Sequence, residues 1–383
     1  MQATPRIVGV IPGDPFDRVT WSGASHHLFT ALDRKGALAG AVDARPHPAL
    51  DYVAKVAAFS PRGMRRWKER YEYSHVTRAG LSVAGGRRAR RVNSHPDALL
   101  QVGAWYDFAR FPGLKPSLRS SYHDANLALY AREWIFVEDV GARHIRRTMA
   151  AERRLFDRLD LIMPMSDWLR RSLIDDFHQD PGKVVTVGAG ANIPRLPDVP
   201  ERDWGRPRLL FIGLEWERKG GPTLLAAFRR LRAERPDAEL WIVGRERPAG
   251  TGEDAGVTWM GRINRRTPGG DAEMARLHRE ATAYVMPSLF DPFANVFLEA
   301  MAWGLPCVGA DRCSMPEVIQ DGVTGLIAPA GDADALAERL LTLAGEPERA
   351  SRMGAAGRER FLEHFTWDRV ADKMVGEISA RLG

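Results

Sequence analysis

Two adjacent cations, Arg218 and Lys219, lie in a glycine-containing loop past the middle of the chain. The loop spans residues 213–222, follows the apolar run 209–212 and ends in a proline, which suits the first turn of a helix. Glycines such as Gly213 let the backbone approach a ligand, and amides at a helix start add partial positive charge. The pattern indicates a diphosphate site, and the alternative is a solvated basic pair in a flexible turn.

Two carboxylates follow at a separation of eight residues. Asp291 stands in the loop after the apolar run 283–286, and Glu299 stands in the otherwise apolar segment 296–303. An unpaired buried carboxylate is costly, so Glu299 requires partners. The two hydroxyls of a ribose fit that need, and a structural ion pair with a nearby arginine is the alternative. The backbone amides between the two acids are candidate phosphate donors, except that of Pro292, which has no N–H: Phe293, Ala294, Asn295 and Val296.

The segments around these residues alternate between short apolar runs and longer helical patterns. The runs expected to be strands are 209–212, 240–243, 257–260, 283–286 and 306–308, and the expected helices are 223–234, 271–281 and 296–303. Such alternation predicts βαβ units and a doubly wound parallel sheet, an α/β fold. Ligands bind such sheets at the carboxyl ends of the strands. Arg262 and Ile263 directly follow one of these strands, where we expect them to flank a nucleotide base.

The first half of the chain indicates the same fold class less completely. Strands are expected at 6–11, 99–103, 117–122 and 161–163, with helices at 25–34 and 167–177, whereas residues 35–98 show little periodicity. Gly13 and Gly23 follow the first strand and could bring the backbone close to the phosphates of the ligand. The alternative is that they are ordinary turn glycines. His123 follows the run 117–122 directly. Two interpretations remain: His123 is a catalytic residue facing an interdomain cleft, or it is a structural histidine.

A chain of 383 residues is too long for one typical domain. The proline-rich connector 192–200 predicts the boundary. We therefore expect two domains, one over residues 1–195 and one over residues 196–364. Residues 365–383 are expected to form a C-terminal helix that packs back on the N-terminal domain.

Composition narrows the possible classes of protein. No apolar run approaches the roughly 18–20 residues that span a bilayer, and the N-terminus lacks a signal-peptide layout. A soluble, cytoplasmic protein is expected. The two cysteines, Cys307 and Cys313, are too few for a disulfide framework or a four-cysteine zinc site, and we expect neither a metal nor another cofactor.

The net charge of +6 is distributed unevenly. Residues 62–91 hold ten lysines and arginines against two glutamates, and a second basic stretch covers residues 143–158. A basic N-terminal half favours anionic acceptors or peripheral contact with an anionic membrane, with solvated helix faces as the alternative. Nucleic acid is not expected, because interleaved aromatic platforms are missing.

Two short motifs match nucleotide-binding signatures in sequence but not in their surroundings. Asp332-Ala333-Asp334 has the D-x-D form of a metal–nucleotide motif, but it opens a helical segment, where Asp332 is predicted to be a cap. Gly188-Ala189-Gly190 begins like a dinucleotide fingerprint, but prolines and not a helix follow it.

Several of these motifs together resemble the family 4 glycosyltransferases, which are retaining enzymes with the GT-B fold of two facing Rossmann-like domains and an interdomain cleft. The motifs are Arg218-Lys219-Gly220, Asp291-x7-Glu299, Ala300-Met301-Ala302, Gly304-Leu305-Pro306, 315–325 and 365–367. The resemblance covers nearly all of residues 205–383 and covers residues 1–195 only loosely, through 122–124 and 188–192.

The resemblance implies metal-independent transfer of a sugar, with retention, from a nucleoside diphosphate sugar to an acceptor hydroxyl. The acceptor, which residues 1–195 would bind, is a glycan, a lipid-linked group or a small molecule, and residues 196–364 would bind the nucleotide sugar. Arg218 and Lys219 would stabilise the leaving diphosphate, with His123 on the acceptor side. Glu299 would hold the ribose, and Asp291 would contact the donor sugar.

The chain departs from the family pattern at four positions. Asp291 replaces a glutamate and is one methylene shorter, and Pro292, Ala294 and Leu214 replace two glycines and an arginine. These departures bear on the donor sugar, and they keep two other functions open. One is a GT-B enzyme of another reaction, such as an epimerase or a phosphorylase; the other is a non-catalytic partner subunit that binds a sugar nucleotide.

Overall fold

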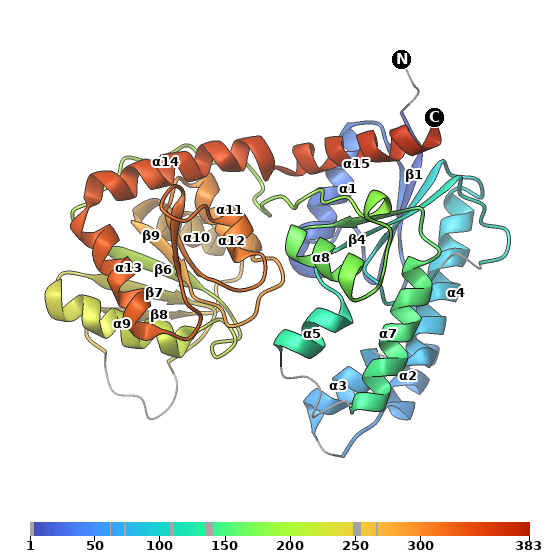
Figure 1. Ribbon diagram of the computed structural model, residues 1–383, viewed down its shortest axis with the longest axis horizontal. Helices are drawn as coiled ribbons and strands as arrows, with labels where there is room; N and C mark the ends of the chain where they lie inside the picture. The colour runs from blue at the N-terminus through green and yellow to red at the C-terminus, as the bar shows by residue number, and fades with distance from the viewer. Residues whose placement is uncertain are drawn as a thin grey trace. The chain divides into compact units, whose positions relative to one another are not determined.

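The computed structural model describes residues 4–61, 63–72, 74–107, 111–134, 141–247, 254–265 and 267–383. The chain forms two compact units (Figure 1). The N-terminal unit contains Met1–Asn192 and Trp367–Gly383, and the C-terminal unit contains Ile193–Thr366. Each unit is an α/β domain with one parallel sheet, as the sequence predicts. The boundary lies at 192/193, compared with the expected 195/196.

The sheet of the N-terminal unit has the strand order β2-β1-β3-β4-β5. Its strands are β1 (Ile7–Ile11), β2 (Leu38–Asp43), β3 (Ala98–Val102), β4 (Leu118–His123) and β5 (Leu161–Pro164). Its helices are α1 (Ala24–Arg34), α2 (Pro48–Ala57), α3 (Met64–Glu72), α4 (His75–Val92), α5 (Leu127–Glu133), α7 (Ala142–Phe156), α8 (Asp167–Asp175) and α15 (Trp367–Leu382), with 3-10 turns at Thr20–Gly23 and Pro181–Lys183. Helix α15 packs against α1, so the C-terminal end of the chain returns to the N-terminal unit.

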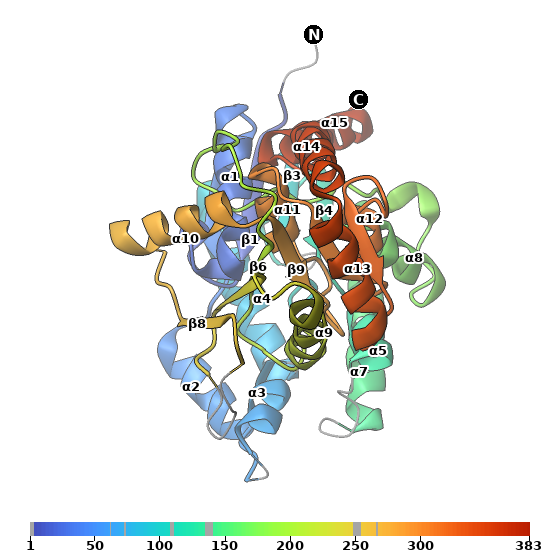
Figure 2. The same ribbon diagram turned by 90° about the vertical axis from the view of Figure 1, so that its left-hand side faces the viewer.

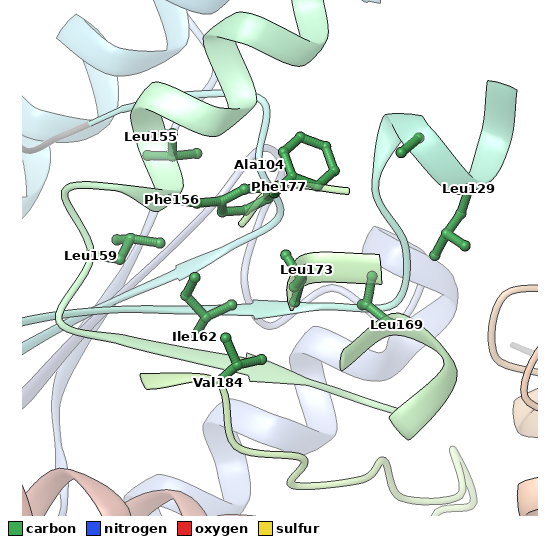
Figure 3. Close-up of a cluster of buried hydrophobic side chains, with 11 residues drawn as sticks. Ala104, Leu129, Leu155, Phe156, Leu159, Ile162, Leu169, Leu173, Phe177 and Val184 are labelled. Carbon is green, nitrogen blue, oxygen red and sulfur yellow. The ribbon is translucent and has the colours of Figure 1, made fainter. Parts of the chain in front are cut away.

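A cluster of apolar side chains from β5, α5, α7, α8 and the segments next to them packs beside the edge strand β5 (Figure 3). The labelled members are Ala104, Leu129, Leu155, Phe156, Leu159, Ile162, Leu169, Leu173, Phe177 and Val184. The rings of Phe156 and Phe177 meet edge to face with centroids 5.1 Å apart. This cluster packs α7 and α8 against the sheet and so fixes the strand ends from which loops emerge.

The sheet of the C-terminal unit has the order β11-β10-β9-β6-β7-β8. Its strands are β6 (Arg208–Ile212), β7 (Glu239–Val243), β8 (Val257–Gly261), β9 (Ala283–Met286), β10 (Cys307–Ala310) and β11 (Gly325–Ala328). Its helices are α9 (Gly221–Glu234), α10 (Pro268–Glu280), α11 (Asn295–Ala302), α12 (Met315–Val318), α13 (Ala333–Gly345) and α14 (Pro347–His364).

Strands β6 and β9 lie side by side at the centre of this sheet (Figure 2). From β6 the chain continues outward through β7 and β8, and from β9 it continues in the opposite direction through β10 and β11. This reversal of strand order is a topological switch point, where doubly wound sheets open a crevice for a ligand. The loops carrying Lys219 and Asp291 leave the sheet at that point.

The two motifs that match nucleotide-binding signatures have structural explanations. Asp332 caps α13, because its Oδ1 accepts hydrogen bonds from the amides of Asp334 and Ala335, each at 3.0 Å. The predicted cap is therefore confirmed. Residues 188–193 are irregular and no helix follows them directly. Among the described helices, none is both long and apolar enough to cross a membrane.

Candidate active site

The loops that follow β6 and β9 are joined directly by their backbones. The Leu289 amide donates to the Arg218 carbonyl at 2.9 Å. Gly220 has a φ of +75°, and a Cβ at this position would lie 1.9 Å from the Pro287 carbonyl oxygen. Only glycine fits this close approach, so the sequence Arg218-Lys219-Gly220 brings its two cations directly beside the end of β9.

Lys219 and Asp291 form an ion pair across this junction, in which the Lys219 ammonium donates to Asp291 Oδ2. The two side chains are only 14% and 11% exposed. Lys219 is therefore not a solvated side chain in a flexible turn, which was the alternative left open by the sequence. When a charged ligand binds, each member of this ion pair can replace its present partner with a group of the ligand. Both charges then remain paired.

Arg218 holds the same two loops together. Its Nη1 donates to the Phe290 carbonyl at 2.6 Å, and its Nε and Nη2 donate to both carboxylate oxygens of Glu215 at 2.7 and 3.1 Å. The guanidinium thus bridges the β6 and β9 loops and is not directed only at open space. This bridging is a structural task that the sequence did not reveal, and the predicted contact of Arg218 with a diphosphate stays a prediction.

A buried tryptophan anchors the loop that carries these cations. Trp216 is 5% exposed, and its ring lies 5.5 Å from that of Phe211 and 5.0 Å from that of Trp259, measured between centroids. A Cβ at Gly221 would approach this ring to 2.1 Å. Trp216 and Gly221 therefore fix the start of α9 together. The sequence signal for this anchor is an aromatic residue in a mostly polar loop.

Helix α11 begins beside Asp291 with an uncapped N-terminus. Its N-cap residue, Ala294, offers no side-chain hydrogen bond, and in the first turn the Phe297 amide donates to the Ala294 carbonyl at 3.0 Å, which leaves the Val296 amide for a ligand. Of the four predicted amide donors, that of Asn295 is already used, because it donates to the Phe293 carbonyl at 3.0 Å within a tight turn. The hydroxyl of Ser314 fixes the loop by donating to the Pro292 carbonyl at 2.7 Å.

Two polar side-chain atoms near this turn are buried without a partner among the described residues, the Ser288 hydroxyl and Asn295 Oδ1. Unsatisfied buried polar atoms are uncommon in folded proteins, and at a loop edge they mark places where a polar ligand can bind. Neither atom was predicted from the sequence, because a serine and an asparagine in a loop carry no distinctive signal.

Glu299 is paired with an arginine. It is 6% exposed, and its Oε2 accepts a hydrogen bond from Arg265 Nη1 at 2.8 Å. Burial raises the pKa of Glu299, and the neighbouring Arg265 acts in the opposite direction. The arginine partner that the sequence left open is present, and ribose binding by Glu299 stays a prediction. Arg265 follows closely after Arg262, which is exposed, and Ile263, which is half-buried, so the ion pair draws this segment towards α11.

The amide of Gly213 is not available to a ligand. It donates to the Val243 carbonyl at 2.9 Å and so continues the pairing of β6 with β7. A Cβ at Gly213 would lie 3.0 Å from the Phe211 ring and 3.1 Å from the Lys219 side chain. In the structure this glycine makes room for the stem of Lys219, and the expected backbone contact of Gly213 with the donor stays a prediction.

In the N-terminal unit, Gly13 and Gly23 both follow β1 in the left-handed region, with φ of +118° and +89°. The Gly13 amide donates to Asp43 Oδ1 at 2.8 Å, and the expected contact of Gly13 with donor phosphates stays a prediction. Gly23 is the N-cap of α1, and no side chain caps that helix. Gly23 therefore retains the position expected of a residue that lets a ligand approach a helix start.

The turn before Gly23 is held in an unusual conformation. Trp21 and Ser22 have φ of +49° and +56°, which is unfavourable for residues with a side chain. Asn192 Nδ2 donates to the Ser22 carbonyl at 3.0 Å, and Trp367 Nε1 donates to Asn192 Oδ1 at 3.1 Å. These contacts support the strained turn, and the sequence indicates none of them.

His123 lies at the end of β4, as predicted, but it is 1% exposed. Its Nε2 lies 2.6 Å from the Ser121 hydroxyl, its ring meets Phe156 edge to face at 5.5 Å, and its Nδ1 has no partner among the described residues. Burial lowers the pKa of His123 to about 3. The structure thus places a neutral imidazole against the core of the N-terminal unit and not in open space, and its catalytic role stays a prediction.

Residues 206–346 match the family model described as glycosyl transferases group 1. The alpha-maltose-1-phosphate synthase of Mycolicibacterium smegmatis is 31% identical in an alignment of 259 residues that covers 58% of this chain and 63% of that protein. The D-inositol 3-phosphate glycosyltransferase of Streptomyces scabiei is 32% identical over 219 residues, 52% of this chain and 49% of that protein. The phosphatidyl-myo-inositol mannosyltransferase of Mycobacterium leprae is 32% identical over 222 residues, 55% of this chain and 56% of that protein.

These matches cover between about half and 63% of the relatives' own lengths. Among solved structures, sucrose-phosphate synthase from Thermosynechococcus elongatus superimposes with a TM-score of 0.70 at 17% identity over 97% of both chains. WaaG, a glycosyltransferase involved in lipopolysaccharide biosynthesis, gives a TM-score of 0.63 at 14% identity over 97% of this chain and 99% of that one. The predicted GT-B class of fold and the resemblance to family 4 glycosyltransferases are both confirmed.

Proposed function

We propose that this relative of the group 1 glycosyl transferases moves a sugar from a nucleoside diphosphate sugar to an acceptor hydroxyl. One observation carries the proposal. The ion pair between Lys219 and Asp291 lies at the switch point between β6 and β9, beside the uncapped start of α11, within the segment that matches the family. A cation, free amides and a carboxylate in one crevice suit the phosphates and the sugar of such a donor.

In this proposal Lys219 and the amides at the start of α11 stabilise the departing diphosphate. Negative charge grows on that group as the bond between the sugar carbon and the phosphate oxygen breaks. Fixed donors that meet developing charge are commonly worth several kcal/mol. The phosphate would replace Asp291 as the partner of Lys219, and the released Asp291 carboxylate would accept a hydrogen bond from a sugar hydroxyl.

The nucleoside would bind on the side of α11 that carries Glu299. Arg265 occupies one oxygen of this carboxylate, which leaves the second oxygen, Oε1, for a ribose hydroxyl. Arg265 also favours the ionised form of this carboxylate, against the effect of burial, which raises its pKa. Arg262 and Ile263 would flank the base.

The acceptor would be held mainly by the N-terminal unit, and we propose that it is anionic. The basic stretches 62–91 and 143–158 belong to this unit. The relatives from Streptomyces scabiei and Mycobacterium leprae are named for inositol 3-phosphate and phosphatidyl-inositol. Retention of the anomeric configuration, metal-independent transfer, a cytoplasmic location and peripheral contact with an anionic membrane are further parts of the proposal.

The experiment that tests the donor is a thermal-shift screen with UDP-, GDP-, dTDP- and ADP-sugars. We expect one nucleotide to raise the melting temperature, and then to be released as free diphosphate when phosphorylated and lipid-linked hydroxyl acceptors are added. Nuclear magnetic resonance of the product reports its anomeric configuration. A chain that neither binds nor turns over any of these donors would contradict the proposal.

A further inference from the structure

A groove with a cavity of about 480 Å³ lies between α2 and α4 of the N-terminal unit, in the part of the molecule where α2, α3 and α4 pack together (Figure 1). Its walls are mainly apolar and small side chains, and its polar lining residues are His47, Asp51, Thr77 and three arginines of α4. The one acidic residue, Asp51, forms an ion pair with Lys55 at 2.7 Å. The lining residues used below are Leu50, Val53, Val76, Gly80, Val83, Arg87 and Arg91. We call these seven residues the α2–α4 groove.

The apolar side chains of the α2–α4 groove are strongly exposed. Leu50, Val53, Val76 and Val83 are 63%, 58%, 56% and 44% exposed. On α4 the residues Val76, Gly80 and Val83 follow at intervals of four and three, so they share one face of the helix. Several large apolar side chains that meet at one exposed groove mark a binding surface more often than scattered single ones do.

Two cations continue the same face of α4 beyond the apolar residues. Arg87 and Arg91 are exposed, and the described residues provide neither with an ion-pair or hydrogen-bond partner. The neighbouring Arg88 is different, because it donates to the carbonyls of Asp43 and Arg45. The groove therefore changes along α4 from an apolar surface to two unpaired positive charges. Such a surface is complementary to a ligand that has an apolar part and an anionic part.

We propose that the α2–α4 groove docks this protein on an anionic phospholipid bilayer. Leu50, Val53 and Val83 would enter the boundary between headgroups and acyl chains, and Arg87 and Arg91 would bind lipid phosphates. Such surfaces bind through buried apolar area together with attraction to anionic lipid. This docking rests on the membrane contact included in the proposed function and assigns it to a surface of the N-terminal unit. It does not require that the site in the C-terminal unit transfers sugar.

Aromatic side chains extend the surface from α2 to α3. Phe59 is 58% exposed and meets Trp67 edge to face at 5.8 Å, while Trp67 Nε1 donates to the Lys55 carbonyl at 2.7 Å. Met64, at the start of α3, is 72% exposed. Aromatic residues that combine an apolar body with a polar tip are enriched where a membrane meets water.

Charge favours a lipid surface over a second copy of this chain as the occupant. Residues 62–91 carry ten lysines and arginines against two glutamates. Two copies that met through this surface would bring like charges together, which costs free energy unless acidic groups separate them. An anionic bilayer brings the opposite charge.

The test is co-sedimentation of the full chain with vesicles of phosphatidylcholine, with and without phosphatidylglycerol. We expect binding to the vesicles that contain phosphatidylglycerol only, and weaker binding at higher salt. Each arginine near an anionic surface contributes roughly a factor of five to partitioning, so Arg87→Gln/Arg91→Gln should lower binding about 20- to 30-fold. Leu50→Ser/Val83→Ser should lower it by roughly tenfold or more.

The matched control is Arg279→Gln/Arg352→Gln, which removes the same charge from two exposed arginines of the C-terminal unit and should leave vesicle binding unchanged. Melting curves verify that each variant is folded. Absent binding, equal binding to both kinds of vesicle, or unchanged binding of Arg87→Gln/Arg91→Gln would overturn the proposal. So would a wild-type dimer in sedimentation that Leu50→Ser/Val83→Ser converts to a monomer. Lipid binding without any nucleotide binding would contradict the proposed function and leave this inference standing.

Discussion

Lys219 and Asp291, separated by 72 residues in the chain, form an ion pair between the loops that follow two adjacent strands, β6 and β9. Each side chain is largely buried. The pair therefore links the residue expected at the diphosphate with the residue expected at the donor sugar. A ligand that binds one of them must change the surroundings of the other.

Lys219→Met should lower kcat roughly 10²–10⁴-fold if the ammonium stabilises the leaving diphosphate. The same substitution leaves Asp291 buried without its partner, which by itself could disturb the site. The double variant Lys219→Met/Asp291→Asn removes that orphaned charge while keeping both side chains near their original size. Steady-state kinetics of the two variants distinguish lost stabilisation of the diphosphate from disturbance of the site by an unpaired Asp291.

If Lys219 acts on the substrate, the double variant stays as slow as the single one. Recovery to nearly wild-type kcat in the double variant would show that Lys219 only neutralises Asp291. Arg279→Ala, at an exposed position on α10, is the control for loss of a positive charge and should leave kcat unchanged.

Asp291→Asn should weaken binding of the intact sugar nucleotide about ten- to a hundredfold, as expected for a lost hydrogen bond to a charged group. Free nucleoside diphosphate should bind equally well or more tightly, because Lys219 is released for its phosphates. Calorimetry with both ligands measures the difference. Equal losses would place Asp291 at the phosphates, and no loss for either would limit its role to holding Lys219.

The sequence predicts the central strands of the C-terminal unit well. β9 has its predicted bounds, and the predicted runs for β6 and β7 lack one residue each. Strands of a parallel sheet that are buried on both faces form continuous apolar runs, which are easily recognised. β2 and helices α2–α4 were not predicted, because β2 is a half-exposed edge strand and the helices expose residues such as Leu50 and Val53 that blur the periodicity.

The sequence also identifies Lys219, Asp291 and Glu299 by residue type and spacing, but not their partners. Arg265 lies 34 residues before Glu299, and the bond from Lys219 to Asp291 spans 72 residues. Such contacts depend on strand order and on loop geometry, neither of which local patterns contain. The same holds for Arg218, whose bridge to the Phe290 carbonyl cannot be predicted from its place beside Lys219.

Transfer should proceed without a divalent metal. In this mechanism the Lys219 ammonium and the amides at the start of α11 supply the charge that a metal ion supplies in other transferases. Activity should survive dialysis against excess EDTA and remain unchanged when Mg²⁺ or Mn²⁺ is added. A loss of activity that either ion restores would contradict this mechanism.

Glu152 should make the folded state less stable as pH rises. Its carboxyl is 2% exposed, accepts from the Leu127 amide at 3.1 Å, and has its pKa raised by burial to about 7. Between the unfolded value of about 4.5 and about 7, the folded state binds the proton more tightly than the unfolded state. The free energy of unfolding therefore falls by up to roughly 3 kcal/mol across this window as pH rises.

Glu152→Gln removes the titration and keeps an oxygen that can accept from Leu127. Denaturant unfolding should show little difference from wild type near pH 4.5 and a growing advantage for the variant up to about pH 8. Glu234→Gln, at an exposed position on α9, should follow the wild-type curve. Parallel curves for Glu152→Gln and wild type would show that this carboxyl is already ionised when folded.

Glu299 should recognise the ribose through the carboxylate oxygen that Arg265 does not occupy. Wild-type protein should bind a nucleoside diphosphate about ten- to a hundredfold more tightly than its 2′,3′-dideoxy form, because a hydrogen bond to a charged group is worth roughly 1.5–3 kcal/mol. Glu299→Gln should weaken binding of the ribose form towards that of the dideoxy form. Calorimetry with both nucleotides, on variants whose melting curves confirm folding, gives the two ratios.

Arg265→Gln is the comparison, because it breaks the same ion pair and retains the carboxylate. If Glu299 were only the partner of Arg265, both variants would lose stability, and wild-type protein would bind the two nucleotides equally.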